Sequence, residues 1–300
     1  MLRPRLSFLT TIALLCAGAT GCTLIENLDR FRTADGGASG DASVSDASAA
    51  TDASARNLGC NNPETLCVRL TDFTPHLGEF VDIDLVTADH TLRARAIFDP
   101  LGAASANIVL PLAIPGSEVP KAGAASTLHL EIWGDQTGDR KYTADKDHDW
   151  VEHLPASGKD VFMHNTAFTN LLPRPRAIGG DFAMNVTGMA IHAGKQFVVI
   201  VIEADSGRTV GSYRLNAIPA SGAFSVTIPE IIDTGSGGGI AYHIEYYADA
   251  NGNGHYDGVG PDHSWVTDVE SDATGLHLTR AHSGPMIEFA PLDYAFDFVK

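Results

Sequence analysis

Two short segments place several oxygen-bearing side chains at alternate positions. The later one, DANGNGHYD, begins at Asp249, and an earlier one, DQTGDRKY, begins at Asp135. Carboxylate, amide and carbonyl oxygens spaced in this way can turn toward one centre, and they are the ligands that Ca²⁺ prefers. The ligand candidates of the later segment are Asp249, Asn251, Asn253, His255 through its carbonyl, Asp257 and Asp262. Those of the earlier segment are Asp135, Thr137, Asp139, Asp145 and Asp147.

The later segment resembles a calcium loop of the EF-hand type, with oxygen ligands at positions one, three and five and a glycine, Gly254, at position six. It departs at position twelve, where Gly260 stands in place of a glutamate. The earlier segment has Arg140 at the glycine position, so we expect a strained backbone and weaker binding there. The alternative for both segments is a solvated turn closed by its own Asx side chains.

Histidines form a second group of candidate ligands. The chain has 12 histidines, and eight of them recur in pairs at a nearly constant spacing. The pairs are His76 and His192, His129 and His243, His148 and His263, and His164 and His282. If three imidazoles of one copy converge, they could bind Zn²⁺ or Cu²⁺. The alternative is that most of these histidines are surface or hydrogen-bonding residues.

One motif suggests catalysis but lacks its partner. The tetrapeptide that begins at Asp233 reads DTGS, which resembles the active-site sequence of aspartic proteases. Those enzymes need two facing aspartates that share a proton, and the chain contains no second DTG. A hydrolase centred on Asp233 is therefore the weakest of the functional hypotheses, and we expect no enzymatic activity.

The elements that must position these residues are duplicated. HLEIWGDQTGDRKY and HIEYYADANGNGHY lie 114 residues apart, and DHDWV and DHSWV lie 115 apart. Constant spacing of separated motifs indicates an internal repeat. We predict two homologous domains, at residues 67–170 and 181–291, joined by a proline-containing linker at 171–180 and followed by a strand or tail at 292–300.

Each copy has the pattern of an all-β domain. Residues 197–202 are a β-branched run, and residues 223–228 alternate with period two, as a half-buried strand does. Residues 209–216 and 240–247 add two more strands, with turn formers between them. The sequence therefore predicts two tandem β-sandwiches of immunoglobulin-like architecture.

The N-terminal segment has the features of an exported lipoprotein. Two arginines precede an apolar run from Phe8 to Ala19. Thr20, Gly21 and Cys22 follow directly. This sequence resembles a bacterial lipobox, although Ala19 stands where a larger aliphatic residue is usual. The resemblance implies cleavage of residues 1–21 as a signal peptide and a palmitate-type lipid on Cys22. Thr23 in place of an aspartate implies an outer-membrane lipoprotein of a Gram-negative cell envelope.

The next segment reads as a flexible tether. Residues 22–57 contain few large apolar side chains, so ordering them would bury little surface. Cys60 and Cys67 follow, and an oxidising compartment favours a local disulfide between them.

The composition limits the partners. The formal net charge is −17, which argues against nucleic acid as a ligand. The sequence predicts a lipid-anchored, non-enzymatic binding or scaffolding protein with calcium-stiffened domains and an unknown protein or glycan ligand. The competing hypothesis is a histidine-based copper or zinc binder.

Overall fold

The computed structural model describes residues 65–103, 108–113, 128–154, 159–166, 168, 177–282 and 290–292. The predicted signal peptide, the tether, Cys22, Cys60 and most of residues 171–180 and 292–300 lie outside this part. Within the part that is described, no helix has the length and apolar character needed to cross a membrane.

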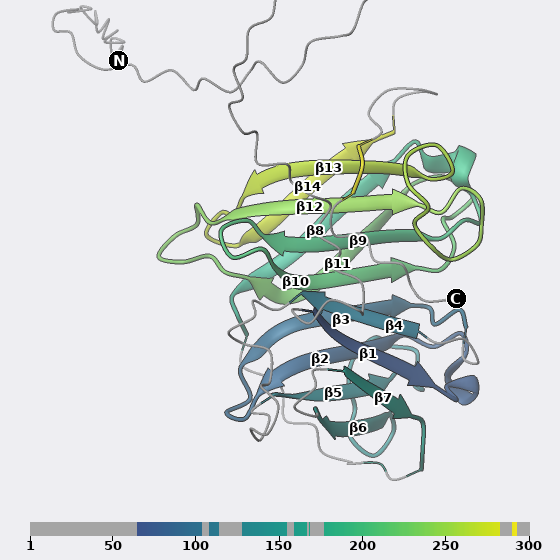
Figure 1. Ribbon diagram of the computed structural model, residues 1–300, viewed down its shortest axis with the longest axis vertical. Helices are drawn as coiled ribbons and strands as arrows, with labels where there is room; N and C mark the ends of the chain where they lie inside the picture. The colour runs from purple at the N-terminus through teal and green to yellow at the C-terminus, as the bar shows by residue number, and fades with distance from the viewer. Residues whose placement is uncertain are drawn as a thin grey trace, which may run out of the picture. The chain divides into compact units, whose positions relative to one another are not determined.

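The described chain is built almost entirely from β-strands, so the all-β prediction is confirmed (Figure 1). The first half contains β1 (Thr65–Thr71), β2 (Val81–Thr87), β3 (Leu92–Asp99), β4 (Ile108–Ala113), β5 (Leu128–Gly134), β6 (His148–His153) and β7 (Lys159–Met163). The second half contains β8 (Gly180–Thr187), β9 (Phe197–Glu203), β10 (Arg208–Leu215), β11 (Phe224–Ile232), β12 (Ala241–Ala248), β13 (His263–Glu270) and β14 (Gly275–Ala281). Two short 3₁₀ helices, η1 (Thr74–His76) and η2 (Met189–His192), occupy equivalent places.

Local sequence accounts for these strands. β9 is a run of branched and aromatic apolar residues that is buried on both faces, and β11 shows the predicted alternation at its start. The four strands expected in the second half correspond to β9, β10, β11 and β12, although β11 continues to Ile232 instead of ending at residue 228.

Each half contributes four strands to one eight-stranded sheet, in the order β13-β12-β9-β10-β3-β2-β5-β6. Two three-stranded sheets, β4-β1-β7 and β11-β8-β14, complete the two halves. The halves meet where β10 pairs in parallel with β3, with Tyr213 opposite Ile97. Sequence analysis did not predict this continuous sheet.

The two hydrophobic cores lie on opposite faces of the shared sheet. In β3, Ala96 and Phe98 belong to the first-half core, whereas Ile97 packs into the second-half core. Ile97 and its register partner Tyr213 point to the same face, because paired residues of neighbouring strands do so, and adjacent residues of one strand point to opposite faces. The second half therefore completes its core with side chains of the first.

Because of this shared packing, we expect the two halves to unfold together. Ile97→Ala should cost about 2–5 kcal/mol of unfolding free energy through the cavity that it leaves in the second-half core. Differential scanning calorimetry should show one transition, shifted as a whole by Ile97→Ala and by Phe98→Ala in the first-half core. Two transitions that respond separately to the two substitutions would contradict this expectation.

Candidate metal centres

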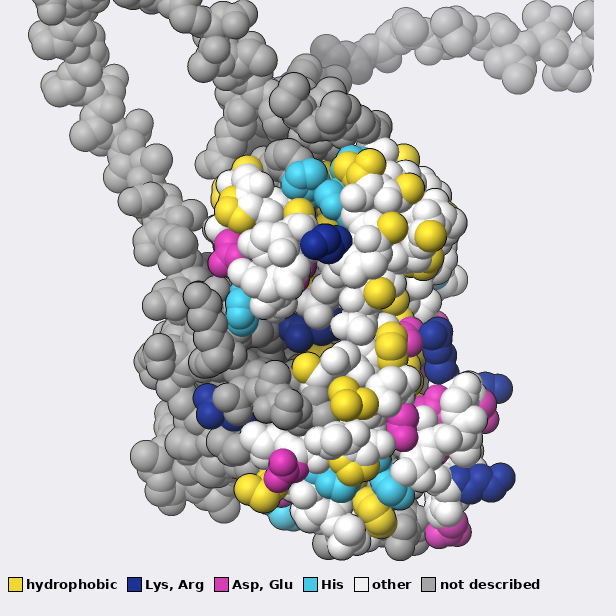
Figure 2. Space-filling view, turned by 90° about the vertical axis from the view of Figure 1, so that its right-hand side faces the viewer, with side chains coloured by type: hydrophobic (Ala, Val, Ile, Leu, Met, Phe, Trp, Pro, Cys, Tyr) yellow, Lys and Arg dark blue, Asp and Glu magenta, His cyan; other side chains and the backbone are white. Residues whose placement is uncertain are grey.

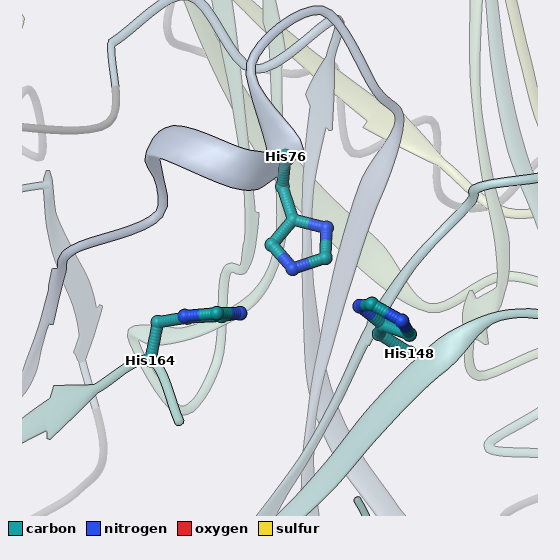
Figure 3. Close-up of side chains that lie close together, drawn as sticks. All are labelled: His76, His148 and His164. Carbon is teal, nitrogen blue, oxygen red and sulfur yellow. The ribbon is translucent and has the colours of Figure 1, made fainter. Parts of the chain in front are cut away.

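Three histidines of the first half converge at one end of its sandwich. His76 ends η1, His148 begins β6, and His164 follows β7 directly. One nitrogen of each ring lies within 4.8 Å of the corresponding nitrogens of the other two. Figure 3 shows the three rings turned toward a common centre from three separate segments. Strand ends and a short helix thus supply three imidazoles that are 16 to 88 residues apart in the chain.

Hydrogen bonds at the outer nitrogens orient two of these rings. His76 Nδ1 lies 2.7 Å from Glu79 Oε2, and His148 Nδ1 lies 3.0 Å from the side-chain amide of Gln136. The Nε2 atoms of His76 and His164 are buried and have no hydrogen-bond partner. A carboxylate on the far nitrogen of a histidine is the usual support of a metal ligand, because it fixes the ring and raises its basicity. The triad therefore presents unused nitrogen lone pairs to its centre.

The surroundings keep these imidazoles neutral. Phe73 and Trp150 lie edge-on or tilted against His76, and Phe168 stacks on His148 at 3.9 Å between ring centroids. Burial lowers the pKa of all three histidines, and for His148 and His164 the neighbouring His76 lowers it further. Neutral imidazole is the form that binds a metal, so protons compete only weakly for this site.

The second half repeats the triad with His192, His263 and His282. His192 ends η2, His263 begins β13, and His282 follows β14. Here His192 Nε2 and His263 Nδ1 lie 2.9 Å apart and share a hydrogen bond. Burial, followed by the neighbouring His263 and His282, lowers the pKa of His192 to about 4. Histidine side chains come to the surface at separate upper and lower places in Figure 2.

The two triads differ in the shell around them. At the repeat spacing, Glu79 corresponds to Lys195, and Gly134 corresponds to Ala248. A Cβ atom on Gly134 would lie 2.9 Å from His76 Nδ1 and 3.3 Å from Glu79 Oε2, so glycine makes room for the His76–Glu79 pair. The first site is therefore supported by a carboxylate at this position, where the second has Lys195.

This difference predicts unequal affinities. Glu79→Gln should weaken zinc binding at the first triad roughly tenfold to a hundredfold, because a supporting carboxylate contributes that much. Gly134→Ala should have the same direction of effect by displacing the Glu79 carboxylate. Competition against a chromogenic zinc chelator, in a chain whose second triad carries His192→Ala, measures the change.

The matched control is Lys195→Gln, which should leave the first triad unaffected. Unchanged zinc affinity in Glu79→Gln would show that the carboxylate does not support the site.

The remaining predicted histidines, His129 and His243, join neither triad. His129 Nε2 and His90 Nδ1 lie 3.2 and 2.9 Å from Glu131 Oε1, and these three residues form a separate group. In the second half, His243 lies 2.7 Å from Asp268 and 3.4 Å from Glu245. Hydrogen bonding to Glu245, and also to Asp268, raises the pKa of His243 to about 9. His243 is thus a charged partner of carboxylates, unlike the neutral histidines of the triads.

The Asp-rich loops are closed by two buried aspartates each. Asp135 and Asp147 accept backbone N–H groups at 2.7–3.2 Å from Gly138, Arg140, Gln136, Thr137 and Thr143. Asp249 and Asp262 do the same for Gly252, Asn253, Gly254, Ala250 and Asp257. At the predicted glycine position, both Arg140 (φ 58°) and Gly254 (φ 84°) have a left-handed backbone.

The other predicted calcium ligands lie at the surface of these loops. Thr137, Asp139, Asp145, Asn251, Asn253 and Asp257 are exposed, and His255 is half-buried. The Asn251 side chain donates to Asp257 Oδ2 at 2.7 Å, and Thr137 donates to Asp139 at 3.1 Å. The exposed oxygens therefore bond within the loops in this structure.

Asp233 forms a turn. Its Oδ1 accepts the N–H of Gly235 at 2.7 Å, as in an Asx turn, and its own N–H donates to the Tyr242 hydroxyl. This arrangement uses the carboxylate to shape the loop after β11.

The sequence patterns did not point to Glu79, Gly134, Gln136 and Phe168, which position the first triad. A signal for the first two was available at the repeat spacing, where Glu79 stands opposite Lys195 and Gly134 opposite Ala248. The contribution of Gln136 and Phe168 depends on tertiary packing and has no local pattern.

Comparisons with known proteins give little guidance. No family model matches the chain, and no curated protein sequence is significantly similar to it. A structure of the Bacillus anthracis TIE protein matches 73% of this chain at 8% identity, with a TM-score of 0.18. A mutant of the shaft pilin SpaA from Lactobacillus rhamnosus GG matches 75% at 8% identity, with a TM-score of 0.19, and is covered over its whole length. This chain spans about a third of the TIE chain. Similarities this distant carry no argument about function, so the function has to be inferred from the candidate metal sites themselves.

Proposed function

We propose that this chain is a non-enzymatic protein that binds a divalent transition metal, zinc or copper, at two tris-histidine centres. The observation that carries the proposal is the convergence of three histidines at the same place in both halves, with unpartnered Nε2 atoms in the first. Three imidazoles suit both metals.

Only a small movement of the histidine side chains is required for each triad to bind zinc. Ligand nitrogens about 2.0–2.1 Å from zinc lie roughly 3.3 Å apart in a tetrahedral site. The nitrogens of each triad already lie within 4.8 Å of one another, so side-chain rotation can bring them together. Retention of the triad in both copies, despite divergence around it, is what binding would require.

Metal content of the purified protein tests this function. Plasma mass spectrometry after zinc loading and removal of excess should find two zinc ions per chain. His76→Ala and His192→Ala should each remove one ion, and the double variant should bind none. His153→Ala, an exposed histidine outside both triads, is the matched control. Equal zinc content in all variants would contradict the proposal.

We further propose that the chain is held in the outer membrane by a lipid on Cys22. The support is the sequence of the apolar run and the small residues before that cysteine. The tether that follows would let the β-structure stand away from the bilayer.

The anchor predicts incorporation of labelled fatty acid. Cells grown with labelled palmitate should yield labelled protein, and Cys22→Ser should abolish the label and release the protein from membranes. Cys16→Ser, within the expected signal peptide, should keep the label. An unlabelled wild-type protein would rule out the lipid anchor.

Calcium binding at the Asp-rich loops is a second candidate function. The observation that favours it is the burial of Asp249 and Asp262 in one loop, where burial and then the Asp249 charge raise the pKa of Asp262. A cation would relieve that repulsion.

Calcium should therefore stabilise the folded chain. At a concentration a hundredfold above its dissociation constant, calcium would add about 2.7 kcal/mol to the free energy of unfolding. Asp257→Asn should reduce the difference in melting temperature between calcium and chelator, because the exposed Asp257 carboxylate, which accepts from the Asn251 side chain at 2.7 Å, is one of the predicted calcium ligands. Asp205→Asn, an exposed acid of another turn, is the control. A melting temperature that does not change with calcium would contradict calcium binding and would show that these loops are only turns.

A further inference from the structure

A groove of about 600 Å³ lies on the face of the shared sheet that carries Ile97, away from the first-half core. Its floor is formed by β2, β3 and β5, and one wall by β11 of the second half. The loop after β5, at residues 140–142, forms part of its rim. Both halves thus build the groove, and it is separate from the histidine triads.

The floor carries buried charge. Arg95 donates to both oxygens of Asp84, at 2.6 and 2.9 Å, and its remaining terminal nitrogen donates to the carbonyl of Pro229 at 2.9 Å. This fork ties the floor to the β11 wall and occupies three of the five N–H groups of Arg95. The hydrogen bonds of Arg95 thus go to Asp84 and to β11, while its ion pair with Asp82 is longer, at 3.4 Å.

Two further carboxylates on the floor keep an oxygen without a hydrogen bond. Asp82 is 5% exposed and Glu131 is 1% exposed, and both line the groove. Asp82 Oδ1 and Glu131 Oε2 have no hydrogen-bond partner, and the nearest cationic nitrogen to Asp82 Oδ1, Arg95 Nε, lies 3.4 Å away. Buried polar atoms are costly when unpaired, so these oxygens mark positions for donors from a ligand.

The fold itself does not require these carboxylates. At the repeat spacing, Asp82 and Asp84 correspond to Val198 and Ile200, which pack with Tyr247 in an apolar cluster on the equivalent face of the second half. The same strand therefore forms with an apolar floor. Retaining buried acids in only one copy points to recognition by that copy.

Aromatic rings complete the groove. Trp133 packs against Phe80 at 5.3 Å and Tyr142 at 6.0 Å between ring centroids. Arg140 at the rim is held by Asp99 at 2.8 Å, and Asp99 also accepts the Tyr213 hydroxyl. The lining thus combines flat apolar faces with acceptors below and cationic donors at the rim.

We propose that this groove binds a saccharide. Sugar hydroxyls can donate to Asp82 and Glu131 and accept from the rim cations, while the apolar face of a sugar ring packs on Trp133. Burial raises the pKa of Asp82 to about 8, so at neutral pH this carboxyl is mostly protonated and offers a hydroxyl hydrogen in addition. The protonated Asp82 carboxyl, together with Arg140 and Lys141 at the rim, disfavours an organic cation, the alternative ligand that aromatic rings and acids attract.

The test uses the full chain in EDTA, so that the histidine triads hold no metal. The result then does not depend on whether the triads bind metal as proposed. Cellobiose, lactose, maltose and N,N′-diacetylchitobiose are titrated while tryptophan fluorescence and saturation-transfer NMR are recorded. At least one disaccharide should bind, one molecule per chain. Trp133→Ala should weaken binding by roughly tenfold or more, because the ring contact is lost.

The decisive variant is Asp82→Val, which copies Val198 of the second half. It should abolish binding while the melting temperature stays the same or rises, because a desolvated buried carboxyl is removed while Arg95 keeps both hydrogen bonds to Asp84. Asp205→Asn is the control and should bind as the wild type does. The proposal is overturned if none of the four disaccharides binds, if binding survives both groove substitutions, or if spermidine occupies the groove and the sugars do not.

Discussion

The parallel pairing of β10 with β3 is the contact on which the arrangement depends. It turns two four-stranded sheets into one sheet, and it removes an exposed edge from each half. Because the two cores then lie on opposite faces, each half has a second face of its own strands that lies outside its own core. In the first half that face becomes the floor of the groove, and β11 of the other half becomes its wall. Two independent sandwiches would not have formed this groove, because its floor and its wall come from different halves.

The two halves share the same frame of strands and short helices, and they differ in the residues around it. The triads keep their positions at η1 and η2 and at the matching strand ends, but Glu79, the carboxylate behind His76, stands where the second half has Lys195. The outer sheet faces diverged more, from acids in β2 to aliphatic residues in β9. Since strands form with either choice at these positions, folding alone does not account for the acids of β2.

The sequence predicted the repeat, the all-β class and the pairing of histidines, because these are visible as spacing and periodicity. It did not predict that His76, His148 and His164 converge while His129 stays apart, since convergence depends on where loops and strand ends meet. It also could not show that the aspartates expected to bind calcium would divide into buried ones that accept backbone N–H groups and exposed ones. The groove could not be predicted from the sequence, because strands of both halves form it, with lining residues that include Asp82 and Glu230.

The Asp-rich loops and the histidine triads are mechanically connected. Asp147 and Asp262 close their loops through backbone N–H groups, and the next residue in each case is a triad histidine, His148 or His263. A buried aspartate that accepts several N–H groups fixes the backbone on either side of it. The backbone of the histidine that follows is therefore held in place, which would lower the entropy lost if a metal bound there. A cation that tightened the loop would act in the same direction, so the two candidate sites in each half would support each other.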